Sequence, residues 1–171
     1  MKIGILSDTH KKLGRAKKVI DLLVENGAEY FIHAGDICEV EVLRYLVEKK
    51  LPYVAVYGNN DSNMVQYHDE FNLVQEPHLF KIQDVTFKLM HLPYYMSPET
   101  DIVVFGHTHT FECDFKNGTL FINPGEACAR NKPISECVML SVEKDSFKIE
   151  AFYRELKTDE WKIKHMNFER N

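Results

Sequence analysis

Short apolar runs alternate with amphipathic stretches through the first part of the chain. Residues 3–6, 30–33 and 53–57 are apolar runs of strand length, of the kind that is buried on both faces of a parallel sheet. Between them, residues 15–26 and 39–49 repeat apolar positions at three- and four-residue spacing, which predicts two helices that each bury one face. Strands and helices therefore alternate as βαβαβ, and this order predicts a parallel sheet with right-handed crossovers.

The second half of the chain has a different pattern, in which hairpins replace the strand–helix alternation. Residues 62–76 are polar and irregular. Paired apolar runs then predict three hairpins, at 79–82 with 85–90, at 111–115 with 119–122 around Asn117-Gly118, and at 136–142 with 147–153. Residues 101–105 read as one further buried strand. The charged tail, residues 154–171, is expected to be an edge strand or an arm packed on the surface.

Composition narrows the class of protein. The 171 residues are expected to form one domain, residues 1–171, and the 44% hydrophobic and 27% charged content is typical of a soluble globular protein. A net charge of −5 argues against a surface that wraps nucleic acid, although a local basic patch stays compatible with it. No apolar run approaches the length of a membrane span, and no signal-peptide pattern or C-x-x-C pair occurs. We therefore expect a cytoplasmic protein with reduced thiols and no membrane partner.

Side chains that can bind metals follow each of the first three predicted strands. Asp8 and His10 follow the first strand, Asp36 follows the second, and Asn59 and Asp61 follow the third. Alternate residues of an extended chain point the same way, so Asp8 and His10 are expected side by side if the extended chain persists beyond the strand. Ligand sites of parallel sheets lie beyond the carboxyl ends of the strands. One such Gly-Asp or Gly-Asn pair is only a turn signal, but three at equivalent positions favour a metal site.

Histidines extend this pattern into the second half. His91 follows a predicted hairpin strand, and Gly106-His107-Thr108-His109 follows a buried strand with the same alternate spacing. Imidazole nitrogens suit Mn²⁺, Fe²⁺, Ni²⁺, Co²⁺ or Zn²⁺ better than Ca²⁺. By contrast, we interpret His33, in the middle of a strand, as a packed structural histidine, and Cys38 as a buried, inert thiol.

Five ordered motifs carry a family resemblance. In chain order they are Asp8-x-His10, Gly35-Asp36, Gly58-Asn59-Asn60-Asp61, His91 and Gly106-His107-x-His109. They resemble the calcineurin-like metallophosphoesterases, and most closely the small YfcE-like phosphodiesterases, whose fold the retromer scaffold subunit Vps29 shares. The resemblance covers Met1 to about Tyr153 and implies an α/β fold: a four-layer α/β/β/α sandwich of two mixed sheets flanked by helices. The hydrophobic pattern is compatible with that fold but does not place the second sheet.

The resemblance also implies a site and a reaction. One divalent cation would be held by Asp8, His10, Asp36 and His109, and a second by Asp36, Asn59, His91 and His107, so that Asp36 bridges the two. Mn²⁺ and Ni²⁺ are favoured, with Zn²⁺, Fe²⁺ or Co²⁺ also compatible. A hydroxide held between the cations would attack the phosphorus of a small, nucleotide-like phosphodiester. Asp61 is expected to orient a ligand or a substrate group.

Three departures from the family pattern affect these expectations. Asn60 stands where the wider superfamily has a His thought to protonate the leaving group, and where the small bacterial group usually has Cys. An amide has no proton to give at a useful pKa, so we expect poor leaving groups to react slowly. Leu92-Pro93 and a short loop replace a glycine-containing stretch. Glu126 stands in the place of a usual Ser, with no orientation implied by the sequence.

Two functional classes stay open. The first is a two-metal phosphodiesterase, with a phosphomonoesterase or a bis-nucleoside polyphosphate hydrolase as its nearest rival. The second is a non-catalytic, protein-binding scaffold on the same fold. Family members of the second kind have lost metal-site histidines, whereas this chain keeps every expected ligand, which favours the enzyme. The natural substrate and the oligomeric state, including a homo-oligomer, are left open by the sequence.

Overall fold

Strands make up most of the protein, and they form two mixed sheets. The computed structural model describes residues 1–170. The first sheet is built from β1 (Lys2–Leu6), β2 (Tyr30–His33), β3 (Tyr53–Val56), β4 (Leu73–Val74), β10 (Ile134–Val142), β11 (Ser146–Glu155) and β12 (Trp161–Glu169). Its strand order is β12-β11-β10-β1-β2-β3-β4. The second sheet contains β5 (His78–Ile82), β6 (Val85–Leu89), β7 (Ile102–Val104), β8 (Phe111–Lys116) and β9 (Thr119–Pro124), in the order β5-β6-β7-β9-β8.

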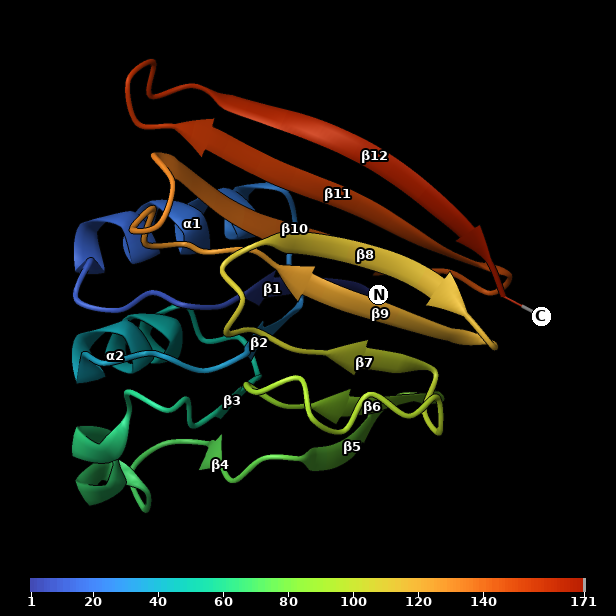
Figure 1. The fold of residues 1–171 in the computed structure, drawn as a ribbon, viewed down its shortest axis with the longest axis horizontal. Helices are drawn as coiled ribbons and strands as arrows, with labels where there is room; N and C mark the ends of the chain where they lie inside the picture. Colours follow the sequence, from blue (N-terminus) through green and yellow to red (C-terminus); the bar gives the residue numbers. More distant parts are fainter. Residues whose placement is uncertain (171) are drawn as a thin grey trace.

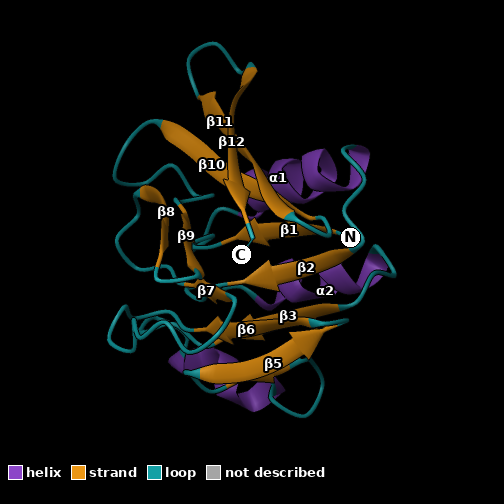
Figure 2. Cartoon of the chain, turned by 90° about the vertical axis from the view of Figure 1, so that its right-hand side faces the viewer, coloured by secondary structure: helices purple, strands orange, loops and turns teal. Residues whose placement is uncertain are grey.

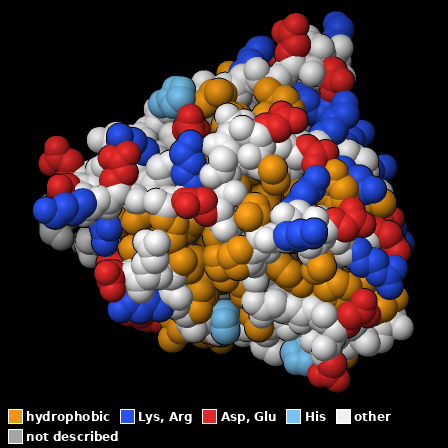
Figure 3. Space-filling view, turned by 180° about the vertical axis from the view of Figure 1, so that it is seen from behind, with side chains coloured by type: hydrophobic (Ala, Val, Ile, Leu, Met, Phe, Trp, Pro, Cys, Tyr) orange, Lys and Arg blue, Asp and Glu red, His pale blue; other side chains and the backbone are white. Residues whose placement is uncertain are grey.

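The helices cover the outer face of the seven-stranded sheet. These are α1 (Leu13–Glu25), α2 (Val40–Glu48) and the 3₁₀ helix η1 (Ser62–Tyr67). Figure 2 shows α1 and α2 on one side of this sheet and the five-stranded sheet on the other. The predicted apolar stripe of α1 is buried, because Val19, Ile20 and Leu23 pack in one cluster with Phe31 of β2. In Figure 3, which shows this side of the molecule, hydrophobic side chains gather across the middle and charged ones surround them.

The main core lies between the two sheets. Ile3 and Ile5 of β1 face it, while their neighbour Leu6 packs toward the helices. From the five-stranded sheet, Phe87 and Val104 enter the same cluster. The alternation of faces along the strands thus separates a helix–sheet core from a sheet–sheet core. This arrangement confirms the predicted pair of mixed sheets in an α/β sandwich.

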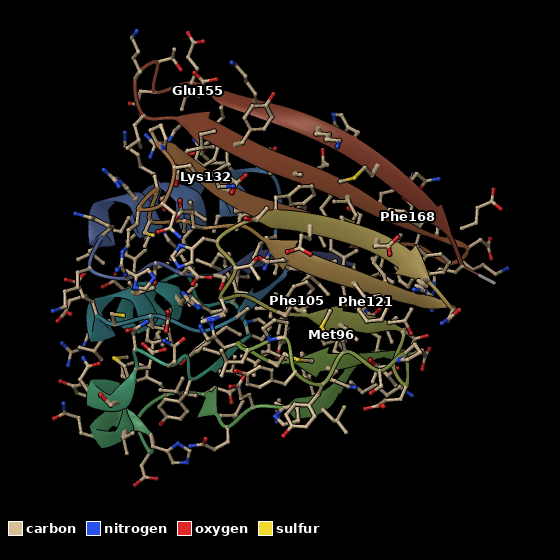
Figure 4. All side chains as sticks on the ribbon, viewed as in Figure 1. Met96, Phe105, Phe121, Lys132, Glu155 and Phe168 are labelled. Carbon is tan, nitrogen blue, oxygen red and sulfur yellow. The ribbon has the colours of Figure 1, made fainter. Side chains whose placement is uncertain are left out.

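A loop covers the outer face of the five-stranded sheet, where residues 1–170 contribute no helix. Met96 from the segment between β6 and β7 packs with Phe105 and Phe121 (Figure 4). Beneath this loop Lys88 is only 1% exposed, and its Nζ donates to the carbonyl oxygens of Tyr95 and Ser97 at 3.1 and 3.2 Å. We call residues 92–100 the β6–β7 loop. A buried ammonium group therefore holds the β6–β7 loop on the sheet.

The elements agree with the sequence patterns, with two refinements. The charged tail is an edge strand, because β12 pairs antiparallel with β11 along its whole length, from Trp161 to Glu169. The stretch that the sequence analysis described as irregular, residues 62–76, contains η1 and the two-residue strand β4, which pairs with β3. No helix in the described part of the chain has the length and apolar character that crossing a bilayer requires.

Six strands from the two sheets end at one edge of the molecule. β1, β2 and β3 run parallel to one another, and so do β6, β7 and β9. In Figure 1 the carboxyl ends of both sets lie at the left-hand side, where the chain leaves for α1 and α2. The loops after these strands carry every predicted site residue. The sandwich therefore brings together motifs that are about a hundred residues apart.

Candidate metal centre

A turn after β1, and not a continuation of the strand, brings the side chains of Asp8 and His10 together. β1 ends at Leu6, and both residues lie in the left-handed region, with φ of 52° and 43°. His107 and His109 after β7 do the same, with φ of 69° and 58°. The sequence analysis expected the side chains of Asp8 and His10 to meet if the extended chain persisted; they do meet, but the chain is not extended there. Left-handed backbone costs a non-glycine residue roughly 1 kcal/mol or more, so the surrounding structure must hold these turns in place.

One group of donors surrounds the Asp8 carboxylate. Ligand atoms of Asp8, His10, Asp36 and His109 all lie within 4.8 Å of one another. Asp8 Oδ1 is 3.2 Å from His109 Nε2 and 3.8 Å from His10 Nε2. The two imidazole nitrogens are themselves 3.4 Å apart. These are the four residues expected around the first cation.

Asp36 lies between this group and a second one. Its Oδ2 is 3.6 Å from His10 Nε2 and 3.5 Å from His91 Nε2. Asn60 donates to both carboxylate oxygens, from its backbone N–H at 2.9 Å and from Nδ2 at 2.7 Å. Burial raises the pKa of Asp36, but the facing histidines, His91 foremost, and the Asn60 hydrogen bonds outweigh it, and the net pKa is lowered. Asp36 is therefore an anion placed between two groups of histidines.

The second group contains the remaining predicted ligands. Asn59 Oδ1 lies 2.9 Å from His91 Nε2 and 3.1 Å from His107 Nδ1. On its other side, His91 Nδ1 is 2.8 Å from the carbonyl oxygen of Ala34. Since a carbonyl oxygen only accepts, His91 donates from Nδ1, which leaves Nε2, the nitrogen that faces Asn59 and Asp36, as the one available to a cation. The structure thus brings all seven predicted ligand residues together.

The donor chemistry fits a cation. His91 Nε2 lies 2.9 Å from Asn59 Oδ1 and 3.5 Å from Asp36 Oδ2, so a nitrogen and two oxygens that can all bind a metal converge on one point. In the first group, Asp8 Oδ1 is buried and has no hydrogen-bond partner within residues 1–170. Its other oxygen, Oδ2, accepts from Ser7 Oγ at 2.6 Å. Burial is the main cause that raises the pKa of Asp8. Converging lone pairs and an unpaired buried carboxylate oxygen are relieved when a positive ion lies among them.

Glu126 is part of the site, and the sequence analysis gave it no orientation. Its Oε2 lies 2.6 Å from Nδ1 of His109. Both of its oxygens also accept backbone N–H groups of the following turn, from Arg130, Asn131 and Lys132 at 2.9–3.1 Å. Burial raises the pKa of Glu126, yet His109 and these N–H donors lower it below its usual range. The signal available in the sequence was its place just after β9, at the edge where the other motifs lie.

Three other residues of the sequence analysis take supporting positions. Asp61 turns its carboxylate to the backbone and accepts N–H groups of Ile37, Cys38 and Gly58 at 2.7–3.1 Å, which ties the loops after β2 and β3 together. His33 is fully buried, and its Nε2 lies 3.1 Å from Thr9 Oγ1, as expected of a structural histidine. Cys38 Sγ is 3.6 Å from His10 Nδ1, and burial raises the pKa of this thiol to about 12.

Close backbone approach explains two of the motif glycines. A Cβ on Gly58 would overlap the backbone and carboxylate of Asp36. A Cβ on Gly106 would overlap Ser7 Oγ and the Ala34 carbonyl oxygen, and it would lie 3.1 Å from Asp8 Oδ2. Only glycine lets these loops approach one another this closely.

A cleft of about 560 Å³ opens beside the first donor group. Its lining is basic and polar, and consists of His10, Lys11, Lys12, Cys38, Asn60, Asn63 and Arg130. Burial lowers the pKa of His10, and the Arg130 guanidinium contributes in the same direction, which places this cation within electrostatic reach of the site. The cleft therefore joins the candidate metal centre to a cationic surface.

Comparison with known proteins agrees with this geometry. Residues 1–145 match the calcineurin-like phosphoesterase superfamily domain. The chain belongs to this superfamily. A phosphodiesterase of Methanocaldococcus jannaschii is 30% identical over 161 residues, which span 86% of this chain and 97% of the relative. The phosphodiesterase YfcE of Escherichia coli is 26% identical over 146 residues, which span 73% of this chain and 78% of YfcE.

Solved structures of other proteins share the fold. An archaeal phosphodiesterase aligns with a TM-score of 0.75 at 26% identity, over 97% of this chain and all of that one. Vps29 of Chaetomium thermophilum aligns with a TM-score of 0.80 at 15% identity, over the whole of both chains. The Vps29 likeness shows the fold alone. Superfamily membership and phosphodiesterase relatives indicate a hydrolase that uses divalent metal ions.

Proposed function

We propose that this protein is a phosphodiesterase that binds two divalent cations and hydrolyses small, nucleotide-like phosphodiesters. The observation that carries the proposal is the position of Asp36. One of its carboxylate oxygens lies 3.6 Å from His10 Nε2 and 3.5 Å from His91 Nε2, between two otherwise separate donor groups. A carboxylate in that position is suited to bridge two cations. The phosphodiesterase relatives support a diester as the substrate.

The chain offers each cation a different environment. Asp8, His10 and His109 would hold the first cation with Asp36, and Asn59, His91 and His107 would hold the second with the same carboxylate. Mn²⁺ and Ni²⁺ are the ions we favour. When bound, the pair would supply the positive charge that generates a nucleophile from water at neutral pH and clamps the phosphoryl oxygens. Asn59 contributes a neutral oxygen, so the second cation would keep more of its charge for the substrate.

The residues around these ligands fix their direction. Glu126 and the Ala34 carbonyl accept the Nδ1 protons of His109 and His91, which leaves both Nε2 lone pairs free for a cation. Asn60 holds Asp36 through two hydrogen bonds but has no proton to offer a leaving group. We therefore expect the enzyme to favour diesters with good leaving groups, such as nitrophenolate, over those that must release an alkoxide.

The test combines metal binding with turnover. Metal-free protein is titrated with Mn²⁺, Ni²⁺ or Zn²⁺, and the bound metal is quantified by inductively coupled plasma mass spectrometry. We expect two ions per chain, and hydrolysis of bis(p-nitrophenyl) phosphate that exceeds hydrolysis of p-nitrophenyl phosphate. Asp36→Asn should lose ions and turnover together. Asp84→Asn, an equal change in an exposed hairpin turn, is the matched control and should lose neither.

Other outcomes would favour the competing functions. Preference for p-nitrophenyl phosphate would identify a phosphomonoesterase on the same site. A folded protein that binds no cation and turns over neither ester would contradict the proposal and favour a protein-binding scaffold, the alternative that shares the fold of Vps29. Two bound ions without turnover would retain the metal centre but overturn the assigned reaction.

A further inference from the structure

The basic cleft opens directly onto the candidate reaction centre. Two of its lining residues, His10 and Asn60, also contact Asp36, at 3.6 Å and 2.7 Å. A group bound in the cleft would therefore be a neighbour of a phosphate bound at the candidate metal centre. The cleft volume of about 560 Å³ leaves room for more than one phosphate.

The charges of the cleft are uncompensated. Lys11, Lys12 and Arg130 are exposed, and within residues 1–170 none of the three has a carboxylate oxygen within 4.0 Å. No carboxylate is among the residues that line the cleft. Nearby cations differ, because Lys18 and Arg154 both pair with Asp159. In a chain with a net charge of −5, three free cations around one cleft indicate an anionic occupant.

The walls of the cleft are held in place by the fold. Arg15 of α1 donates to the carbonyl oxygens of Cys128 and, at 3.2 Å, Ala129, which fastens the start of the helix to the loop after β9. The Glu126 carboxylate accepts the backbone N–H of Arg130 at 3.0 Å. The cationic side chains therefore project from two anchored backbone segments, which lowers the cost of ordering them around a ligand.

The two lysines also line a neighbouring cleft. This second cleft, of about 490 Å³, is otherwise lined by Gly14, by the cations Arg15, Lys18 and Arg154, and by Leu13 and Leu156. Lys11 and Lys12 are thus shared between the cleft beside the reaction centre and this second cleft. A ligand that places one phosphate at the candidate metal centre and another beside the lysines can extend a sugar or a base toward the two leucines.

We infer that Lys11, Lys12 and Arg130 bind a second phosphate of the substrate, so that the preferred substrates are nucleotide phosphodiesters that carry a further phosphate beside the scissile one. The inference rests on the proposed function for the identity of the scissile group. The second phosphate can be linked through a ribose, as in a short oligonucleotide, or directly, as in a nucleoside polyphosphate. Both sources share the chemistry that the three cations recognise, a compact dianionic or monoanionic phosphate.

Binding measurements test the inference without requiring turnover. Dissociation constants of AMP, ADP and adenosine 3′,5′-bisphosphate are measured by calorimetry, with metal-free protein and again with Mn²⁺. We expect a second phosphate to lower the dissociation constant at least about tenfold, because it would contact the three exposed cations of the cleft. A gain for the 3′,5′-bisphosphate alone identifies the ribose-linked source, and a gain for ADP alone identifies the directly linked one. Equal affinity for all three nucleotides would overturn the inference.

Matched triple variants assign the effect to the cleft. Lys11→Met, Lys12→Met and Arg130→Met are combined and compared with the combination Lys81→Met, Lys116→Met and Lys164→Met, which removes the same charge from exposed positions outside the cleft. The first combination should bind all three nucleotides alike, and the second should keep the wild-type preference. Loss of the preference in both would show a net-charge effect and overturn the inference. Thermal unfolding of both variants controls for folding.

A paired substrate extends the test to catalysis. The p-nitrophenyl ester of thymidine 5′-phosphate is compared with the same ester that carries a 3′-phosphate, so the leaving group is constant. We expect the 3′-phosphate to raise kcat/KM about tenfold or more through KM in wild-type protein if the ribose-linked source is the correct one. Failure of the proposed function would appear separately, as no hydrolysis of bis(p-nitrophenyl) phosphate, and would leave the nucleotide-binding result to decide the inference.

Discussion

Oε2 of Glu126 lies 2.6 Å from Nδ1 of His109, and the opposite nitrogen of that ring faces Asp8 Oδ1 at 3.2 Å. The carboxylate therefore fixes the tautomer of His109 and orients the opposite nitrogen toward the candidate cation. The same carboxylate holds the turn that carries Arg130. One buried acid thus sets the positions of a predicted ligand and of a cleft cation.

Glu126→Gln should weaken metal binding. An amide keeps the size of the side chain but loses the negative charge, and such changes beside a metal-binding histidine cost about 10–100-fold in affinity. Competition with a chelating dye measures the loss. Glu25→Gln, at an exposed acid at the end of α1, provides the control. Equal metal affinity in Glu126→Gln and wild type would contradict the assigned role.

Asn60→His should accelerate reactions that release an alkoxide. A histidine at this position can protonate the leaving group, and general-acid help is worth about 10²–10⁴ in rate. We expect the gain with a thymidine dinucleotide and little change with bis(p-nitrophenyl) phosphate. Asn60→Ala separates this effect from the loss of the hydrogen bond to Asp36. Unchanged rates on the dinucleotide would mean that leaving-group protonation does not limit this enzyme.

Lys88→Met should release the β6–β7 loop. The change keeps the length of the side chain but removes its hydrogen bonds to Tyr95 and Ser97, leaving their carbonyl oxygens without this donor. Losing buried hydrogen bonds to a charged group costs roughly 1–3 kcal/mol. Hydrogen exchange of the loop amides should therefore speed up, while Lys81→Met on β5 leaves it unchanged. Slow exchange in Lys88→Met would show that packing of Met96 alone holds the loop.

His33 should make the protein less stable in acid. Burial lowers its pKa from 6.5 to about 3, with nearby His91 acting in the same direction. The unfolded chain takes up this proton below about pH 6.5 and the folded protein only near pH 3, so acidification through that range favours unfolding. Between these two pKa values the free energy of unfolding falls by about 1.4 kcal/mol per pH unit. Well above pH 6.5 neither state takes up this proton, and no stability is lost.

Urea unfolding between pH 7 and pH 4, in the presence of a chelator, measures this slope. His33→Gln removes the titrating group, so its free energy of unfolding should fall less steeply with acid than that of wild type. His165→Gln, on the exposed tail strand, should keep the wild-type slope. Parallel curves for wild type and His33→Gln would show that other groups cause the acid sensitivity.

The sequence identified the residues of the site more completely than it predicted their geometry. The motif residues from Asp8 to His109 do converge, because parallel strands deliver their carboxyl ends to one edge. The convergence depends on left-handed turns at Asp8, His10, His107 and His109, which no periodicity reveals. A pattern of alternating side chains describes a strand, and these residues lie beyond the strands.

The orientation of Glu126 and the position of the second sheet could not be predicted from the sequence, for a different reason. Both depend on contacts between residues far apart in the chain, such as those of Glu126 with His109 and of Gly106 with Ser7. Local hydrophobic pattern determines which face of a strand is buried but not which element covers it. The tail shows the same limit, since its charged residues are compatible with an arm until β11 is available as a pairing partner.

The edge where six strands end has a consequence for the mechanical integrity of the protein. Asp36 follows β2 of one sheet, and His91 and His107 follow β6 and β7 of the other. A cation that binds these residues together would cross-link the two sheets, and the sheets could then separate only after the cation dissociates. Resistance to heat, proteases or pulling should therefore rise with the concentration of free metal, in proportion to the logarithm of its excess over the dissociation constant. Metal supply would then set the lifetime of the folded chain as well as its chemistry.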